Sequence, residues 1–152
     1  MKYLHRMMVV ALCAALAACA ATTLHREGLA EVDRGEYETG VNKLTEAVAK
    51  DPNNLSFKLD LAARRGAAVQ KLIGAADRAR AEARMDEAIA TYRRALTIEP
   101  TNQRALHGIE GVQADRRHGA MVVDAAKAFE RKDYDAADAI LHIVLQLSLI
   151  HI

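Results

Sequence analysis

An apolar run near the start of the chain ends in a cysteine, and this is where the sequence most clearly offers chemistry. Lys2 and Arg6 come first, residues 7–18 carry no charge, and Cys19 follows directly. A run of this length is too short to span a membrane as a helix, which needs about 20 apolar residues. A basic start and a short apolar run are typical of a secretory signal peptide. We therefore expect residues 1–18 to be removed from the mature protein.

The residues at the end of this run also suggest how the cysteine is used. They resemble the lipobox of bacterial lipoproteins, and they are Leu16, Ala17, Ala18 and Cys19. The resemblance implies that the signal peptidase recognises the first three residues and cuts before Cys19, whose thiol then carries a diacylglycerol. The alternative is an ordinary signal peptide, cut at this place, with an incidental cysteine.

The cysteine count and the next residue agree with a lipid anchor. Cys13 lies in the predicted signal peptide, so the mature chain would keep Cys19 alone, and one cysteine forms no internal disulfide. In the lipoprotein family an aspartate after the cysteine retains the protein in the inner membrane. Ala20 at this position implies anchoring in the outer membrane, on its periplasmic face.

The rest of the sequence offers little catalytic chemistry. His107 and His118 share a predicted helix face but stand about 16 Å apart at 1.5 Å per residue, too far to bind one metal ion. We identify no glycine-rich phosphate loop and no nucleophile elbow. We therefore predict that the protein is not an enzyme and has no catalytic residues, no metal site and no cofactor. The net charge of +1 gives no indication of nucleic-acid binding.

The composition favours a helical fold. Apolar residues make up 51% of the chain, yet aromatic residues make up only 4% and Trp is absent. Alanine and leucine supply most of the apolar content, and both are strong helix formers.

Three segments of the chain repeat one pattern, which must position any binding surface. They are residues 35–54, 83–102 and 132–150. Tyr37, Met85 and Tyr134 occupy one place in the pattern, and Pro52 and Pro100 another, 48 residues apart. Apolar residues follow helical spacing in each segment. These are Val41, Leu44 and Val48 in the first, Ala88, Ile89, Tyr92, Ala95 and Leu96 in the second, and Ile140, Leu141, Val144 and Leu145 in the third.

We expect the prolines to end these helices, Asn54 and Asn102 to cap the next ones, and Gly35 to adopt a left-handed conformation.

A partner helix precedes each of these segments. Small or apolar residues share one face of it: Leu24 and Gly28 in the first, Leu72, Ala76, Ala79 and Ala83 in the second, and Met121, Ala125 and Ala128 in the third. The helix–turn–helix pattern resembles the tetratricopeptide repeat (TPR), most closely over residues 85–102. The resemblance implies an all-α, TPR-like solenoid. This chain departs from the family pattern because no Trp opens a repeat and Gly40 stands where the second unit has Ala88.

The spacing of 48 residues exceeds the usual 34 of the family, and the first helix of each later unit is expected to be longer. We predict one helix over Leu55–Ala83, with Leu55, Leu59, Ala62, Gly66 and Val69 forming one stripe, and a second long helix over Gln103–Lys132. The alternative is a separate short helix inserted between standard repeats. The expected organisation is a signal peptide (1–18), a lipidated terminus (19–21) and three TPR-like units (22–54, 55–102 and 103–152).

The end of the chain looks truncated. Residues 141–152 are nearly all apolar, whereas a stacked array normally ends in a polar capping helix. The last six, "LSLIHI", also resemble translated sequencing-adapter DNA. We therefore expect the natural protein to continue past the third unit.

These patterns predict a protein-interaction module. We expect a protein or peptide partner and no nucleic acid. A resemblance to secretin-type outer-membrane proteins implies that this partner belongs to a secretion, pilus or envelope-assembly system. In helical arrays the first helix of each unit lines the concave face, so the candidate contact residues are Gln70, Asp77, Arg80, Arg117 and His118. Their mixed charge is also consistent with a solvated helix face.

The lipobox and the long first helices resemble the amino-terminal region of secretin-type outer-membrane proteins of type II secretion and type IV pilus systems. The alternatives are a free-standing pilotin or assembly-type lipoprotein, or the non-catalytic amino-terminal region of a cell-wall enzyme.

Overall fold

The computed structural model describes residues 19–150, with side chains as far as residue 146, and every regular element in this range is an α-helix. Residues 19–34 form the first helical stretch. The later helices are α2 (Tyr37–Lys50), α3 (Leu55–Ala81), α4 (Met85–Ile98), α5 (Gln103–Glu130) and α6 (Tyr134–Ile150). The predicted all-α class is therefore confirmed for this range. The predicted signal peptide and the lipobox residues Leu16, Ala17 and Ala18 lie outside it.

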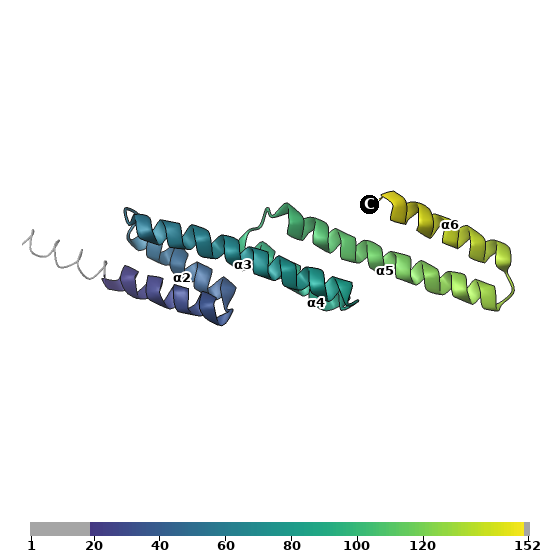
Figure 1. Cartoon of the computed structure of the whole chain (residues 1–152), viewed down its shortest axis with the longest axis horizontal. Helices are drawn as coiled ribbons and strands as arrows, with labels where there is room; N and C mark the ends of the chain where they lie inside the picture. Colours follow the sequence, from purple (N-terminus) through teal and green to yellow (C-terminus); the bar gives the residue numbers. More distant parts are fainter. Residues whose placement is uncertain (1–18, 151–152) are drawn as a thin grey trace, which may run out of the picture.

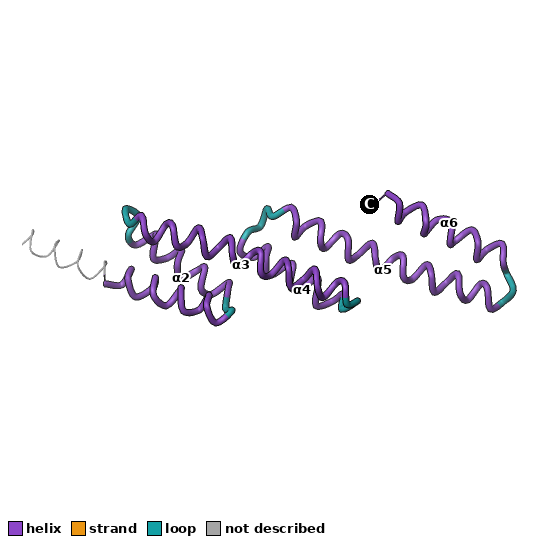
Figure 2. The backbone as a smooth tube through the Cα atoms, in the orientation of Figure 1, coloured by secondary structure: helices purple, strands orange, loops and turns teal. Residues whose placement is uncertain are grey.

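Short loops join the helices into an elongated array (Figures 1 and 2). The first helical stretch and α2 lie beside the amino-terminal half of α3, and α4 lies beside its carboxyl-terminal half. The amino-terminal half of α5 packs against α4, and α6 returns alongside the carboxyl-terminal half of α5. Helices of 27 and 28 residues, α3 and α5, thus each contribute to two successive helix pairs.

The helix starts follow the predicted capping chemistry. The side chain of Asn54 accepts a hydrogen bond from the backbone N–H of Phe57 at 3.3 Å, and that of Asn102 accepts one from Ala105 at 3.0 Å. Each asparagine satisfies one of the backbone donors that a helix leaves unpaired in its first turn. The helices α2 and α4 end before Pro52 and Pro100, as predicted.

Within each pair, the turn contains one residue in the left-handed conformation. These residues are Gly35, Ala83 and Lys132, with φ of 91°, 58° and 63°. The backbone N–H of Arg84 donates to the carbonyl of Ala79 at 2.8 Å, which closes the second turn in the manner of a Schellman motif. Ala83 was expected on the buried stripe of a helix. It is instead an exposed turn residue, because α3 ends at Ala81.

One continuous helix covers the region where an inserted short helix was the alternative. Its predicted apolar stripe is wrong at Leu55, Leu59, Ala62 and Gly66, which are exposed, whereas Val69 is buried as predicted. Leu55 and Leu59 are 67% and 61% exposed, whereas Phe57 is only 8% exposed. The amino-terminal half of α3 packs against the first pair. The side chains that this pair covers are therefore Phe57 and the half-buried Leu61. The stripe was extrapolated from the carboxyl-terminal half, which faces α4 instead.

The first helical stretch and α2 approach unusually closely. A Cβ placed on Gly28 would lie 2.9 Å from the carbonyl oxygen of Gly40, and one on Gly40 would lie 2.7 Å from the backbone nitrogen of Val32. No side chain fits at either position without movement of the backbone. Gly40, which departs from the family pattern, is thus explained by the close contact of these two helices.

The third pair differs from the prediction in its outer surface. Ala125, Ala128 and Ala137 are buried between α5 and α6, as the small-residue pattern suggested. Leu141 and Leu145, which were expected on a buried face, are 43% and 61% exposed. They project from α6 where no described helix covers them.

Candidate interaction surfaces

The predicted contact residues of α3 lie where α3, α4 and α5 meet. Asp77 accepts a hydrogen bond from the hydroxyl of Tyr92 at 2.5 Å and another from Arg104 at 2.7 Å. Arg104 also donates to the side chain of Gln70 at 3.3 Å. Gln70 and Asp77 are therefore brought together through one arginine of α5.

Burial of Tyr92 has an electrostatic consequence. Tyr92 is 1% exposed. Burial raises the pKa of its phenol to about 12, and the hydrogen bond to Asp77 adds to this rise. The phenol thus keeps its proton at pH values well above those at which tyrosine usually titrates. Tyr92 ties the polar residues of this junction to the apolar cluster that joins α3, α4 and α5.

Arg80 makes a second link from α3 to α5. Its Nε donates to Asp115 at 2.6 Å, and this hydrogen bond raises the pKa of the Arg80 guanidinium. The guanidinium lies over Gly111, where an added Cβ would come within 2.4 Å of it. A charge reversal at Arg80 would therefore place two carboxylates together and weaken the α3–α5 contact. Such a variant would test the stability of the junction as well as partner capture.

Arg117 and His118 lie on α5, outside the junction that holds Gln70, Asp77 and Arg80. Arg117 is exposed and His118 is half-buried. The structure thus gathers three of the five candidates into a network with α5. Partner binding by all five stays a prediction.

Two members of the network, Arg104 and Asp115, were missed at the level of sequence. Asp77 and Arg80 on α3 each pair with a residue of opposite charge on α5. No pattern in the sequence indicates which charged residues of two separate helices will meet, so these two partners could not be found without the structure.

Other charged side chains also link helices. Arg94 donates to both carboxylate oxygens of Glu38, at 2.6 and 3.0 Å, and joins α4 to α2. The hydrogen bond from Arg94 lowers the pKa of Glu38. Arg116 pairs with Asp86 across α5 and α4. Much of the mixed charge on these helices is thus arranged in pairs within the protein.

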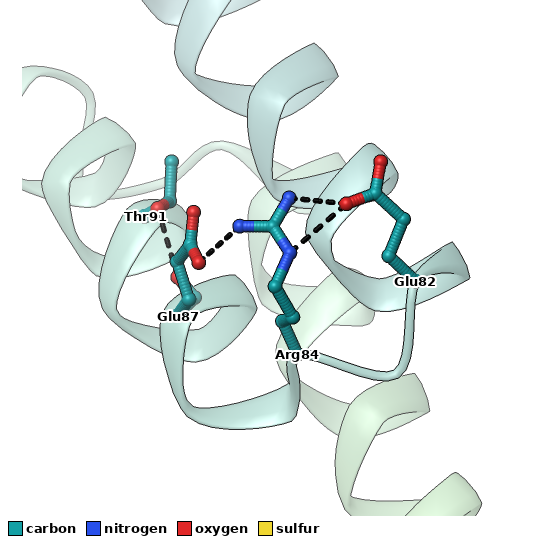
Figure 3. Close-up of polar contacts among 4 residues, drawn as sticks. All are labelled: Glu82, Arg84, Glu87 and Thr91. Carbon is teal, nitrogen blue, oxygen red and sulfur yellow. Dashed lines mark hydrogen bonds and ion pairs between the residues drawn. The ribbon is translucent and has the colours of Figure 1, made fainter.

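The turn between α3 and α4 shows this interleaving in detail (Figure 3). The Arg84 guanidinium lies between the carboxylates of Glu82 and Glu87 and hydrogen-bonds to both. Thr91 donates its hydroxyl to the carbonyl of Glu87 at 2.8 Å. The side chain of Arg84 is 47% exposed, so these ion pairs contribute little to stability. The charged side chains of this turn therefore form a solvated surface.

The first pair contains a histidine with two well-defined partners. The His25 ring stacks on Phe57, with centroids 4.2 Å apart, and its Nε2 lies 2.8 Å from a carboxylate oxygen of Asp60. The side chain of His25 is 14% exposed. These contacts fix the first helical stretch against the start of α3. In the part of the chain that the structure describes, no three His, Cys, Asp or Glu side chains group in a way that could hold a metal ion.

Cys19 is exposed at the first described position. Ala21, two residues later, is fully buried against Ala47 and Phe57. Among residues 19–150, none of the helices combines the length and apolar character needed to cross a membrane.

An exposed apolar surface lies on the third pair, toward the end of the array away from Cys19 (Figure 1). The exposed large apolar side chains of this pair are Val122, Val123, Phe129, Tyr134, Leu141, Ile143 and Leu145. Comparison of the chain with known protein families, with characterised proteins and with solved structures found no match.

Proposed function

We propose that this protein is a lipid-anchored interaction module, held through Cys19 on the periplasmic face of the outer membrane. One observation carries the proposal. The exposed cysteine lies at one end of an elongated helical array, and exposed apolar side chains gather on the last pair, toward the other end (Figure 1). Exposed apolar side chains gathered on one helix pair are a feature of sites for another protein.

The lipobox at Leu16–Cys19 supports the anchor. A single acyl chain binds a membrane weakly, whereas a diacylglycerol supplies the two chains that stable anchoring requires. The TPR-like pattern of the helix pairs supports the role of interaction module. The partner we favour is a component of a secretion or pilus system, in line with the resemblance to secretin amino-terminal regions.

The anchor is tested with labelled palmitate and membrane fractionation of cells that express the full chain. We expect the wild-type protein to take up label and to fractionate with membranes. Cys19→Ser should take up no label and accumulate as uncleaved precursor. A mature, soluble and unlabelled wild-type protein would refute the anchor.

The interaction role is tested by crosslinking in intact cells, with a photoreactive amino acid at Leu141 and, as a control, at Ala90, which is exposed on α4. We expect a discrete protein adduct from Leu141 and none from Ala90. Absence of any adduct at Leu141, in a protein shown to be folded, would argue against this role for the last pair.

A further inference from the structure

The proposed anchor is only two residues away from the packed part of the protein. Cys19 is the first described residue and is helical, and Ala21 is fully buried against Ala47 and Phe57. Two residues of a helix span about 3 Å along its axis. A diacylglycerol on Cys19 would therefore be attached without a flexible tether, and the protein surface around Cys19 would lie against the lipid head groups.

The start of α3 lies at the same end of the array as Cys19 (Figure 1). Phe57 of α3 packs in one cluster with Ala21, and Leu55 comes two residues before Phe57. Side chains in a helix tilt toward its amino terminus. Because Leu55 is the first residue of α3, its side chain tilts toward the end of the array that carries Cys19.

The first two turns of α3 expose two leucines. Leu55 and Leu59 are 67% and 61% exposed. They are one helical turn apart and lie on the side of α3 opposite Phe57. The positions that follow them on this side, Ala62 and Gly66, are also exposed and carry no charge. The apolar stripe that the sequence predicted to be buried therefore lies on the outside of the array, beginning beside Cys19.

The charges around these leucines complement an anionic surface. Residues 50–60 contain two lysines and two aspartates. The carboxylates of Asp51 and Asp60 lie 3.1 and 2.8 Å from side-chain nitrogens of the protein. Lys50 and Lys58 are exposed, and neither forms an ion pair with another of the residues whose side chains the structure describes. Exposed leucines with lysines beside them are the combination by which a helix binds an anionic membrane surface.

We propose that the first two turns of α3 rest on the lipid bilayer beside the anchor. Leu55 and Leu59 enter the head-group region, and Lys50 and Lys58 contact the phosphates of anionic phospholipids. The inference rests on the proposed anchor at Cys19 and names a second contact that the anchored protein makes with the membrane. With two contacts in place of one, the array cannot swing freely about its lipid.

The contact is measured with a fluorophore on Leu59→Cys in the lipidated full-length protein. The protein is purified from membranes, labelled, and reconstituted in vesicles of phosphatidylethanolamine and phosphatidylglycerol. The acylated thiol of Cys19 does not react with the label. Lipids that carry a nitroxide on the head group quench fluorophores at the bilayer surface. Leu145→Cys is the matched control, since Leu145 is also 61% exposed but lies on α6. We expect quenching at least threefold stronger at Leu59 than at Leu145.

Three further variants identify the groups that make the contact. Leu55→Glu and Lys58→Glu should each reduce the quenching of the Leu59 probe at least twofold. Lys71→Glu should leave the quenching unchanged, because Lys71 is also an exposed lysine of α3 but lies in the half that packs against α4. Circular dichroism should show equal helicity for all three variants, since each replaced side chain is exposed.

Two results in a protein that carries the lipid would overturn the inference and leave the anchor standing. The first is equal quenching at Leu59 and Leu145. The second is a Leu59 probe with blue-shifted emission that the nitroxide lipids do not quench, because protein and not lipid would then cover this surface. Equal effects of Lys58→Glu and Lys71→Glu would remove the lysine from the contact and overturn its charged part. A wild-type protein that takes up no palmitate would refute the anchor, and this contact with it.

Discussion

Replacing Tyr92 with phenylalanine should change how the stability of the protein depends on pH. In the wild type the phenol is buried and donates a hydrogen bond to Asp77 at 2.5 Å. Near neutral pH the variant loses this bond, while Asp77 keeps its bond from Arg104. We expect a cost of about 1.5–3 kcal/mol in the free energy of unfolding, the usual range for a hydrogen bond to a charged group.

At alkaline pH this difference in stability should shrink. The pKa of Tyr92 is raised to about 12 in the folded protein, whereas an unfolded tyrosine titrates near pH 10. The stabilisation from the protonated phenol is therefore fully present below pH 10 and is lost as the pH rises toward 12. The loss amounts to about 1.4 kcal/mol per pH unit, or roughly 2–3 kcal/mol over this window. The variant has no phenol at this position, so the two stability curves should converge as the pH rises from about 10 toward 12.

The assay is urea unfolding followed by circular dichroism at 222 nm, from pH 8 to pH 11.5. Every other titrating group is common to both proteins, so the difference between the curves isolates Tyr92. A difference that stays constant across the range would show that the Tyr92 phenol titrates alike in the folded and unfolded chain. That result would refute the link between its burial and its pKa.

Four further changes test the packing and the second turn by thermal and urea unfolding. Gly108→Ala should destabilise the protein by roughly 1–3 kcal/mol, because the new methyl group meets the Tyr92 ring. Gly66→Ala is the matched control, since an added Cβ there has nothing within 4 Å, and it should stabilise the protein by about 0.5–1 kcal/mol. Equal effects of the two glycine changes would contradict the close contact at Gly108. Leu44→Ala should cost about 2–5 kcal/mol, since Leu44 is fully buried between the first helical stretch, α2 and α3, and an unchanged unfolding midpoint would place it outside the core. Ala83→Gly should stabilise the protein by about 0.5–1 kcal/mol. The relief of left-handed backbone strain in the folded state outweighs the greater freedom of glycine in the unfolded chain. A lower unfolding midpoint would mean that the turn is not strained.

The sequence predicted the helix boundaries well, because the signals that set them are local. A proline two residues after the last helical residue and an asparagine cap act over a few residues, and Pro52 and Asn54 did so as expected. The buried stripe of the carboxyl-terminal half of α3 was predicted correctly at Leu72 and Ala76. Both residues belong to a face that a single partner helix covers.

The predictions failed where a helix changes partners along its length. Leu59 and Phe57 differ in burial because α3 turns one face to the first pair and another to α4, and a continuous stripe cannot represent both. The link between Arg80 and Asp115 was missed for a related reason. It depends on how α3 and α5 lie relative to each other, and no local pattern gives that arrangement.

Because two helix pairs share α3, the length of this helix determines both the distance between the pairs and the rotation of one pair relative to the other. The first pair contacts one half of this helix and α4 contacts the other. One residue inserted near Gly66 would add about 1.5 Å and rotate everything beyond it by about 100° around the helix axis. An insertion of seven residues, close to two full turns, would move the later pairs outward with little rotation. The direction in which the last pair points, relative to Cys19, is therefore fixed by the number of residues in α3 as much as by their chemistry.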